Sequence, residues 1–106
     1  MFNKFKYILS LGQFEIENET HRLLALSFAI KSADIGHGAK RLMVHKMWTR
    51  RICEEFYVQG DLESNYKIRV SPLCDRTKNK VAKSQHGFLT MIVQPLYIVL
   101  DEFLQE

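Results

Sequence analysis

The chain has 106 residues, of which 46% are apolar and 25% are charged, and its formal net charge is +3 at pH 7. This composition is typical of one small globular domain, and it excludes a disordered chain, a collagen and a coiled-coil rod. Cations have carboxylates nearby in the sequence, as in Arg50-Arg51 before Glu54-Glu55, so we expect no nucleic-acid partner. No run of about 18 apolar residues occurs, so we expect no membrane span.

The chain contains two cysteines, Cys53 and Cys74, which are too few for a disulfide framework. We interpret them as free thiols of a reducing compartment. The stretch from Met1 to Leu11 is too short in apolar residues for a signal peptide. The expected localisation is therefore cytoplasmic.

The N-terminal half predicts one main helix, from about Asn18 to Ala33, because apolar residues recur there at helical spacing. Asn18 or Thr20 can cap its start, since a short polar side chain accepts hydrogen bonds from the free N–H groups of the first turn. Gly36 and Gly38 should end it, because glycine tolerates a left-handed backbone. Residues 1–16 leave room for a short preceding helix.

The second half predicts two further helices, over about Lys40–Leu62 and Asn79–Leu104, separated by a loop. Pro95 lies inside the last of these and should kink or break it, because proline has no N–H to donate. No segment alternates as a strand would. The fold class predicted for residues 1–106 is therefore all-α, a compact helical bundle of about three main helices.

Asp34 stands out because it lies in register with the apolar Leu23, Leu26 and Ile30, on the face that should be buried. It also follows the end of a helix, where the dipole disfavours a carboxylate. A buried carboxylate there needs a metal or a basic side chain as partner. The alternative is a partly exposed aspartate that caps the turn through Gly36.

Gln85 is the second polar residue on an apolar stripe, between Val81 and Phe88. An unpaired buried amide costs about 1–3 kcal/mol, so Gln85 either bonds a neighbouring backbone or receives a ligand. His37 lies three residues after Asp34, a spacing that could suit a metal. One Asp and one His are few, however, because catalytic zinc takes three protein ligands.

Five ordered motifs carry a resemblance to a known family: KSADIGH from Lys31, HKMWT from His45, EEFYVQGD from Glu54, SPLCDR from Ser71 and SQHGF from Ser84. Together they resemble the C-terminal part of the class I 3′,5′-cyclic-nucleotide phosphodiesterase catalytic domain, over roughly residues 17–104. The resemblance implies an all-helical, HD-type phosphohydrolase domain. It also implies an enzyme that converts cAMP or cGMP to the nucleoside 5′-monophosphate through a hydroxide shared by two metals.

The resemblance also assigns roles to single residues. Asp34 matches a ligand of the tightly bound metal, usually zinc, the second metal being Mg or Mn. Gln85 matches the glutamine that bonds the purine edge, while Phe88 and Ile52 match the two apolar clamps on the purine faces. His37 resembles the dual-specificity, calmodulin-regulated branch more than the cAMP-selective branches. Further residues that match positions lining or supporting the nucleotide pocket are His37, His45, Trp48, Thr49, Phe56, Leu73 and Ser84.

The chain departs from the family pattern in one respect. Members of the family carry HNxxHA and HDxxH segments, which supply two histidines and a further aspartate, and they also carry a histidine that protonates the leaving oxygen; none of these motifs occurs in these 106 residues. No catalytic residue is therefore assigned within this chain, which supplies one metal ligand. The expected partners are a cyclic nucleotide and the remainder of the catalytic domain, with a homodimer as an open alternative.

Three explanations of this departure stay open: a fragment of a longer product, an incomplete gene model or a degenerate copy. The competing function is a catalytically inactive nucleotide-binding or helical interaction fragment. In either case, the apolar stripes on the second and third helices should face partner helices from the remainder of the domain.

Overall fold

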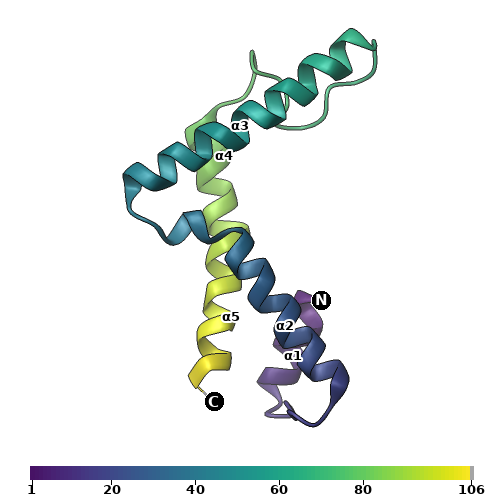
Figure 1. Cartoon of the computed structure of the whole chain (residues 1–106), viewed down its shortest axis with the longest axis vertical. Coiled ribbons are helices and arrows are strands. Elements are labelled where there is room, and N and C mark those ends of the chain that lie inside the picture. Colours follow the sequence, from purple (N-terminus) through teal and green to yellow (C-terminus); the bar gives the residue numbers. More distant parts are fainter. Residues whose placement is uncertain (106) are drawn as a thin grey trace. The chain divides into compact units, whose positions relative to one another are not determined.

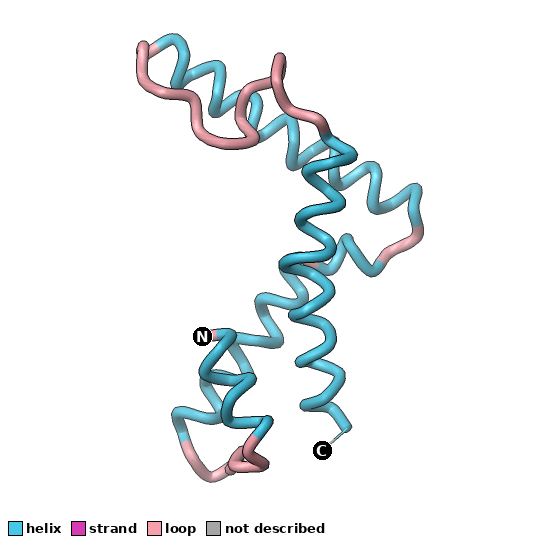
Figure 2. Tube along the Cα trace, turned by 180° about the vertical axis from the view of Figure 1, so that it is seen from behind, coloured by secondary structure: helices cyan, strands magenta, loops and turns pink. Residues whose placement is uncertain are grey.

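The computed structural model describes residues 1–105, and every regular element in that range is helical. The all-α prediction is confirmed for these residues (Figures 1 and 2). The chain divides into two compact units, one of residues 1–36 with the segment from Thr90 onward, the other of residues 37–89. The elements are α1 (Phe2–Ser10), α2 (Glu19–Asp34), a 3₁₀ turn (Gly36–Ala39), α3 (Leu42–Asn65), α4 (Val81–Phe88), a π-helical turn (Leu89–Val93) and α5 (Gln94–Gln105).

The first unit is built from α1, α2 and α5 around an aromatic core. Phe5 of α1 is fully buried, and its ring centroid lies 4.9 Å from that of Phe28 on α2 and 5.4 Å from that of Phe103 on α5. Leu96 and Val99 of α5 complete the buried cluster. Burial of large apolar side chains is the main stabilising term in such a unit. The short helix expected within residues 1–16 is therefore α1, and it supplies the centre of the core.

Helix α2 begins where its sequence predicts. The side-chain oxygen of Asn18 accepts hydrogen bonds from the backbone N–H groups of Thr20 and His21, at 3.0 and 3.3 Å. The predicted end is also close, at Asp34, but not for the predicted reason. The left-handed conformation expected of Gly36 and Gly38 is absent, and the chain continues directly into a 3₁₀ turn.

The prediction of a buried apolar face carrying Asp34 is wrong for this chain. The buried positions of α2 are Phe28 and Ser32, which face α1 and α5. The exposed fractions of Leu23, Leu26 and Ile30 are 56%, 61% and 72%, and Asp34 is exposed as well. Three apolar residues at helical spacing therefore form a face, here called the α2 apolar face, that the described chain does not cover.

Pro95 changes the hydrogen-bond register of its helix instead of breaking it. The turn of Leu89–Val93, directly before α5, is π-helical, and Pro95 lies in the first turn of α5. Proline leaves the carbonyl four residues earlier without its N–H donor, and a π turn is one way in which a helix accommodates this loss.

By length and composition alone, the helical segment Val81–Gln105 is long and apolar enough to cross a membrane. The sequence predicts no membrane span, because no continuous run of about 18 apolar residues occurs. Core helices of soluble proteins pass the same test. In the α5 part of the segment, Leu96 and Val99 are buried in the core of the first unit.

The second unit is held together by contacts between α3 and the loop that follows it. The carboxylate of Glu63 accepts hydrogen bonds from the backbone N–H and the hydroxyl of Ser71, each at 2.7 Å. Arg76 donates to Asp61 at 2.6 Å, and its guanidinium lies over the ring of Tyr57. These contacts fix both ends of the segment between residues 71 and 76 against the helix.

Gly60 allows this loop to approach α3 closely. A Cβ atom at Gly60 would lie 1.9 Å from the backbone oxygen of Cys74, far inside ordinary contact distance. Gly60 is buried and lies inside α3. Cys74 is buried and Cys53 half-buried, and both are free thiols as predicted.

Candidate purine-binding site

Gln85 of α4 and Thr49 of α3, both predicted pocket residues, meet within the second unit. Thr49 is buried, and its hydroxyl donates a hydrogen bond to the side-chain oxygen of Gln85 at 3.4 Å, the long end of the accepted range. The bond holds the end of the Gln85 side chain against α3. The partner of Gln85 is thus a side chain and not the neighbouring backbone, and the alternative that Gln85 receives a ligand stays a prediction.

Three predicted pocket rings stack in the same unit. The rings of His37 and His45 are nearly parallel, with centroids 5.3 Å apart and an interplanar angle of 6°. The ring of Phe88 lies 6.2 Å from that of His37, at 10°. The 3₁₀ turn, α3 and α4 thus each present one flat ring to a common stack, and flat rings are suited to packing against a purine.

The two histidines carry unsatisfied polar atoms. His37 Nε2 and His45 Nδ1 are buried and have no hydrogen-bond partner among the described residues. Such atoms are costly unless a ligand or water bonds them. Burial, and to a lesser extent the charge of His45, lowers the pKa of His37 below its ordinary value of 6.5. His37 is therefore mainly neutral at pH 7, with one ring nitrogen as donor and one as acceptor.

The remaining predicted residues of α3 lie along the helix from Thr49. Ile52, the predicted second clamp, is half-buried, while Trp48 and Phe56 are 43% and 39% exposed. The guanidinium of Arg51 lies 5.2 Å from the centroid of the Trp48 ring. The stripe is thus only partly covered in the described chain.

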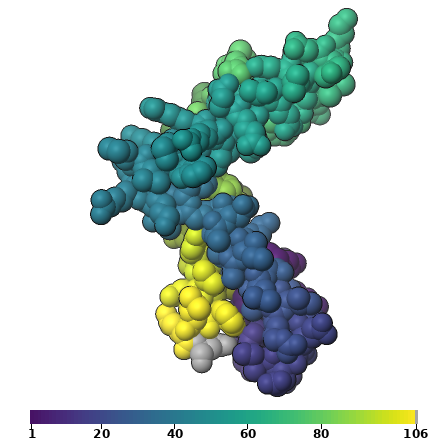
Figure 3. Space-filling model, viewed as in Figure 1, coloured from purple at the N-terminus to yellow at the C-terminus, as the bar shows by residue number. Residues whose placement is uncertain are grey.

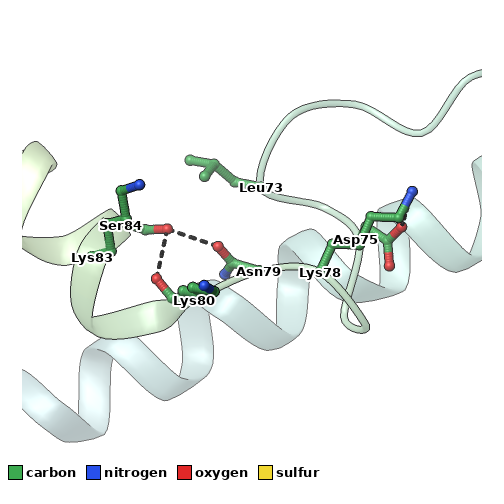
Figure 4. A pocket seen from close by; sticks show the side chains of 7 residues that line it. All are labelled: Leu73, Asp75, Lys78, Asn79, Lys80, Lys83 and Ser84. Carbon is green, nitrogen blue, oxygen red and sulfur yellow. Dashed lines mark hydrogen bonds and ion pairs between the residues drawn. The ribbon is translucent and has the colours of Figure 1, made fainter.

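Leu73 and Ser84, predicted from two separate motifs, line one pocket (Figure 4). Leu73 projects from the loop, and Ser84 lies in the first turn of α4, where its hydroxyl donates to Asn79 Oδ1 at 2.7 Å. Leu73 has a left-handed backbone, with φ of +70°, a strained conformation for a branched side chain. The other residues that line this pocket are Asp75, Lys78, Asn79, Lys80 and Lys83.

Asp34, the predicted metal ligand, belongs to the first unit and is exposed. The described residues contain no group of three or more His, Cys, Asp or Glu side chains that could hold a metal ion. Within these residues, Asp34 and His37 therefore do not form a metal centre by themselves. The described residues could therefore contribute only single ligands to a metal ion.

Sequence reasoning missed the residues that position this site. Gly60 and Arg76 lie inside motifs that carried the resemblance, and Glu63 follows one of them by two residues, yet nothing in their spacing indicated that they join α3 to the loop bearing Leu73. Asn79 is a further example, because its side-chain N–H donates to the Tyr57 hydroxyl at 3.0 Å. For Gly60 and Arg76 the one available signal was their place inside the ordered motifs, and Glu63 and Asn79 lie outside those motifs.

The profile of the 3′5′-cyclic nucleotide phosphodiesterase family matches residues 1–106. This chain therefore belongs to the 3′,5′-cyclic nucleotide phosphodiesterase family, and the resemblance noted over residues 17–104 extends to α1.

Particular relatives agree with this membership. The human dual specificity calcium/calmodulin-dependent 3′,5′-cyclic nucleotide phosphodiesterase 1B is 47% identical over 78 residues, which cover 74% of this chain and 15% of the relative. The dual 3′,5′-cyclic-AMP and -GMP phosphodiesterase beta of Plasmodium falciparum (isolate 3D7) is 48% identical over 99 residues, which cover 92% of this chain and 9% of the relative.

A solved structure of LmjPDEB1 in complex with IBMX is also similar to this chain, with a TM-score of 0.85 and 32% identity. The match covers 93% of this chain and 30% of that one. The chain thus spans only a small part of the length of the proteins that it matches.

Proposed function

We propose that this chain is the purine-binding, C-terminal portion of a catalytic domain that hydrolyses cAMP or cGMP to the nucleoside 5′-monophosphate. The observation that supports this most directly comes from the second unit, where Thr49 holds the side chain of Gln85 in place and Phe88 stacks on His37. An amide beside flat rings is the arrangement that recognises the edge and the face of a base.

In this proposal Gln85 bonds the purine edge, and Phe88 and Ile52 clamp its two faces. His37 and His45 offer buried nitrogens that a base or its water can bond. An amide can present either a donor or an acceptor by flipping, so Gln85 suits adenine and guanine alike. The Thr49 hydroxyl can also donate or accept, so its bond does not bar the flip. We therefore propose dual specificity, which the names of the two curated relatives support.

The family depends on divalent metal ions. We propose that Asp34 supplies one ligand to a zinc ion, with Mg or Mn as the second metal of the complete domain. A bound metal would supply the nucleophile, because it lowers the pKa of water to near neutrality. The other ligands have to come from outside the described residues, which hold no metal cluster of their own.

The α2 apolar face supports the partner that the proposal requires. Leu23, Leu26 and Ile30 are exposed at helical spacing, and such a face normally packs against further protein. We propose that the remainder of the catalytic domain covers it in the cytoplasm, where free cysteines are stable. A second copy of the chain is the alternative occupant, and equilibrium sedimentation at rising concentration distinguishes the two.

The test is a chimera in which residues 1–106, which include α1, replace the matching part of the catalytic domain of the human relative. We expect it to hydrolyse cyclic nucleotides. Gln85→Ala should raise KM about ten- to a hundredfold, from a loss of about 1–3 kcal/mol, with metal content unchanged. The matched control is Gln94→Ala, at an exposed position of the same residue type in the first unit, which should leave KM unaltered.

Asp34→Ala should instead deplete metal and remove kcat. An unchanged KM for both cyclic nucleotides in a folded, metal-loaded Gln85→Ala chimera would refute the purine-binding role of α4. A chimera that binds metal and folds but never turns over would favour the inactive binding fragment.

A further inference from the structure

The charges of α3 are segregated along its length, although Glu54 and Glu55 follow soon after Arg50 and Arg51. Residues 35–53 contain no Asp or Glu, whereas the remainder of the helix holds Glu54, Glu55, Asp61 and Glu63. The acidic half is occupied by the loop, through Glu63 and Asp61. Five cations lie in the segment without acids: Lys40, Arg41, Lys46, Arg50 and Arg51.

These five cations are not neutralised within the described residues. All five are exposed, and the ion pairs found there within 4.0 Å involve only Arg76 and Lys78 as cations. The guanidinium of Arg51 instead lies over the ring of Trp48. The positive charges of these five side chains are therefore available to attract an anionic partner.

Apolar side chains stand between these cations on one face. A shallow groove is lined by Met43, Lys46, Met47, Arg50 and Arg51, here called the basic methionine face. Met43 is 84% exposed and Met47 42%. The segment is coloured blue to teal in Figure 3, where side chains project from it into solvent.

This face lies on the side of α3 opposite Ile52 and borders Thr49. Since each helical residue advances by about 100°, Met43 and Arg50 point roughly opposite to Ile52, whereas Arg50 and Arg51 line a pocket together with Thr49. A partner on the basic methionine face would thus leave Ile52 accessible and would lie beside Thr49.

We propose that the basic methionine face binds an anionic lipid surface peripherally. A helix with cations flanking protruding apolar side chains is suited to the boundary of a bilayer, where methionines enter the acyl region and cations meet phosphate groups. Clustered Lys and Arg add attraction to an anionic leaflet. An acidic protein would use the charges but gains less from Met43, which is 84% exposed.

The experiment is vesicle flotation with the 106-residue chain, because floating vesicles separate bound protein from any aggregate. The chain should float with vesicles of phosphatidylcholine and phosphatidylserine, and much less with phosphatidylcholine alone. The variant Lys46→Gln, Arg50→Gln, Arg51→Gln should reduce partitioning by on the order of a hundredfold at low salt. Met43→Gln should also weaken binding, and the residual binding should be more sensitive to salt.

The matched control is Lys78→Gln, Lys80→Gln, Lys83→Gln, which removes the same charge from another surface of the same unit. It should float nearly as the parent chain does, and circular dichroism checks that all variants keep their helix content. Equal loss in both triple variants, equal flotation with neutral vesicles, or failure to float would overturn the proposal. Capture by polyglutamate beads without flotation would place the partner among acidic proteins instead.

Discussion

Replacing Gly60 by alanine should destabilise the second unit more than any surface change. The added Cβ would lie 1.9 Å from the oxygen and 2.7 Å from the carbon of the Cys74 carbonyl. Reaching ordinary contact needs a displacement of roughly 1.5 Å. The loop cannot shift freely, because Ser71 and Arg76 hold it on either side of Cys74. Overpacking of this kind costs about 1–3 kcal/mol or more, and the better helix propensity of alanine returns only about 1 kcal/mol.

We therefore expect a net loss of at least about 2 kcal/mol, since the clash is with backbone and lies at the severe end of that range. The measurement is urea unfolding followed by the emission of Trp48, the only tryptophan, which lies on α3 of the second unit. The matched control is Gly87→Ala in α4, where no heavy atom lies within 4 Å of the added Cβ. That change should stabilise by up to about 1 kcal/mol. If Gly60→Ala unfolds at the same urea concentration as the parent or a higher one, the close approach of loop and helix is refuted.

Three other outcomes are expected. The purified 106-residue chain should not hydrolyse cAMP or cGMP, because its described residues hold no metal cluster, and turnover that a chelator abolishes would contradict this. The second unit should lose stability as the pH falls below 6.5, because His37 binds a proton more readily in the unfolded state than in the folded state, where its pKa is lowered. Urea titrations at pH 5–7 measure this loss, and His37→Gln should make the stability depend less on pH. Glu63→Gln should lower the urea midpoint at pH 7 and reduce the difference between the urea midpoints at pH 7 and pH 3, because hydrogen bonds from Ser71 hold the pKa of Glu63 below its ordinary value. An unchanged loss of stability between pH 7 and pH 3 would disprove the role of the carboxylate.

The sequence predicted what depends on local pattern and missed what depends on distant contacts. Helical spacing located α2 and α3, and the polar side chain of Asn18 located a start, since these signals lie within a few residues. The buried face of α2 could not be predicted from α2, because several of its faces carry apolar residues and its neighbours in this chain select Phe28. The hydrogen bond between Thr49 and Gln85 joins residues 36 positions apart, and no spacing rule reaches across a loop.

The site was predicted through resemblance more than through physics. Gln85 was noticed as a polar residue on an apolar stripe, but its function came from the ordered motifs. Its contact with Thr49 and the stack of His37 on His45 became visible only in three dimensions. Whether Asp34 ligates a metal stays a prediction, because that depends on residues that these motifs do not include.

The placement of Phe5 bears on how the protein can be trimmed. A truncation that begins at residue 17 would retain all five recognisable motifs and so look complete to anyone choosing boundaries by motif. It would nevertheless delete α1, and with it the fully buried ring on which Phe28 and Phe103 pack. The first unit would then expose those rings to water and be prone to association. The shortest chain that stays in solution therefore has to include α1, although α1 carries none of the motifs.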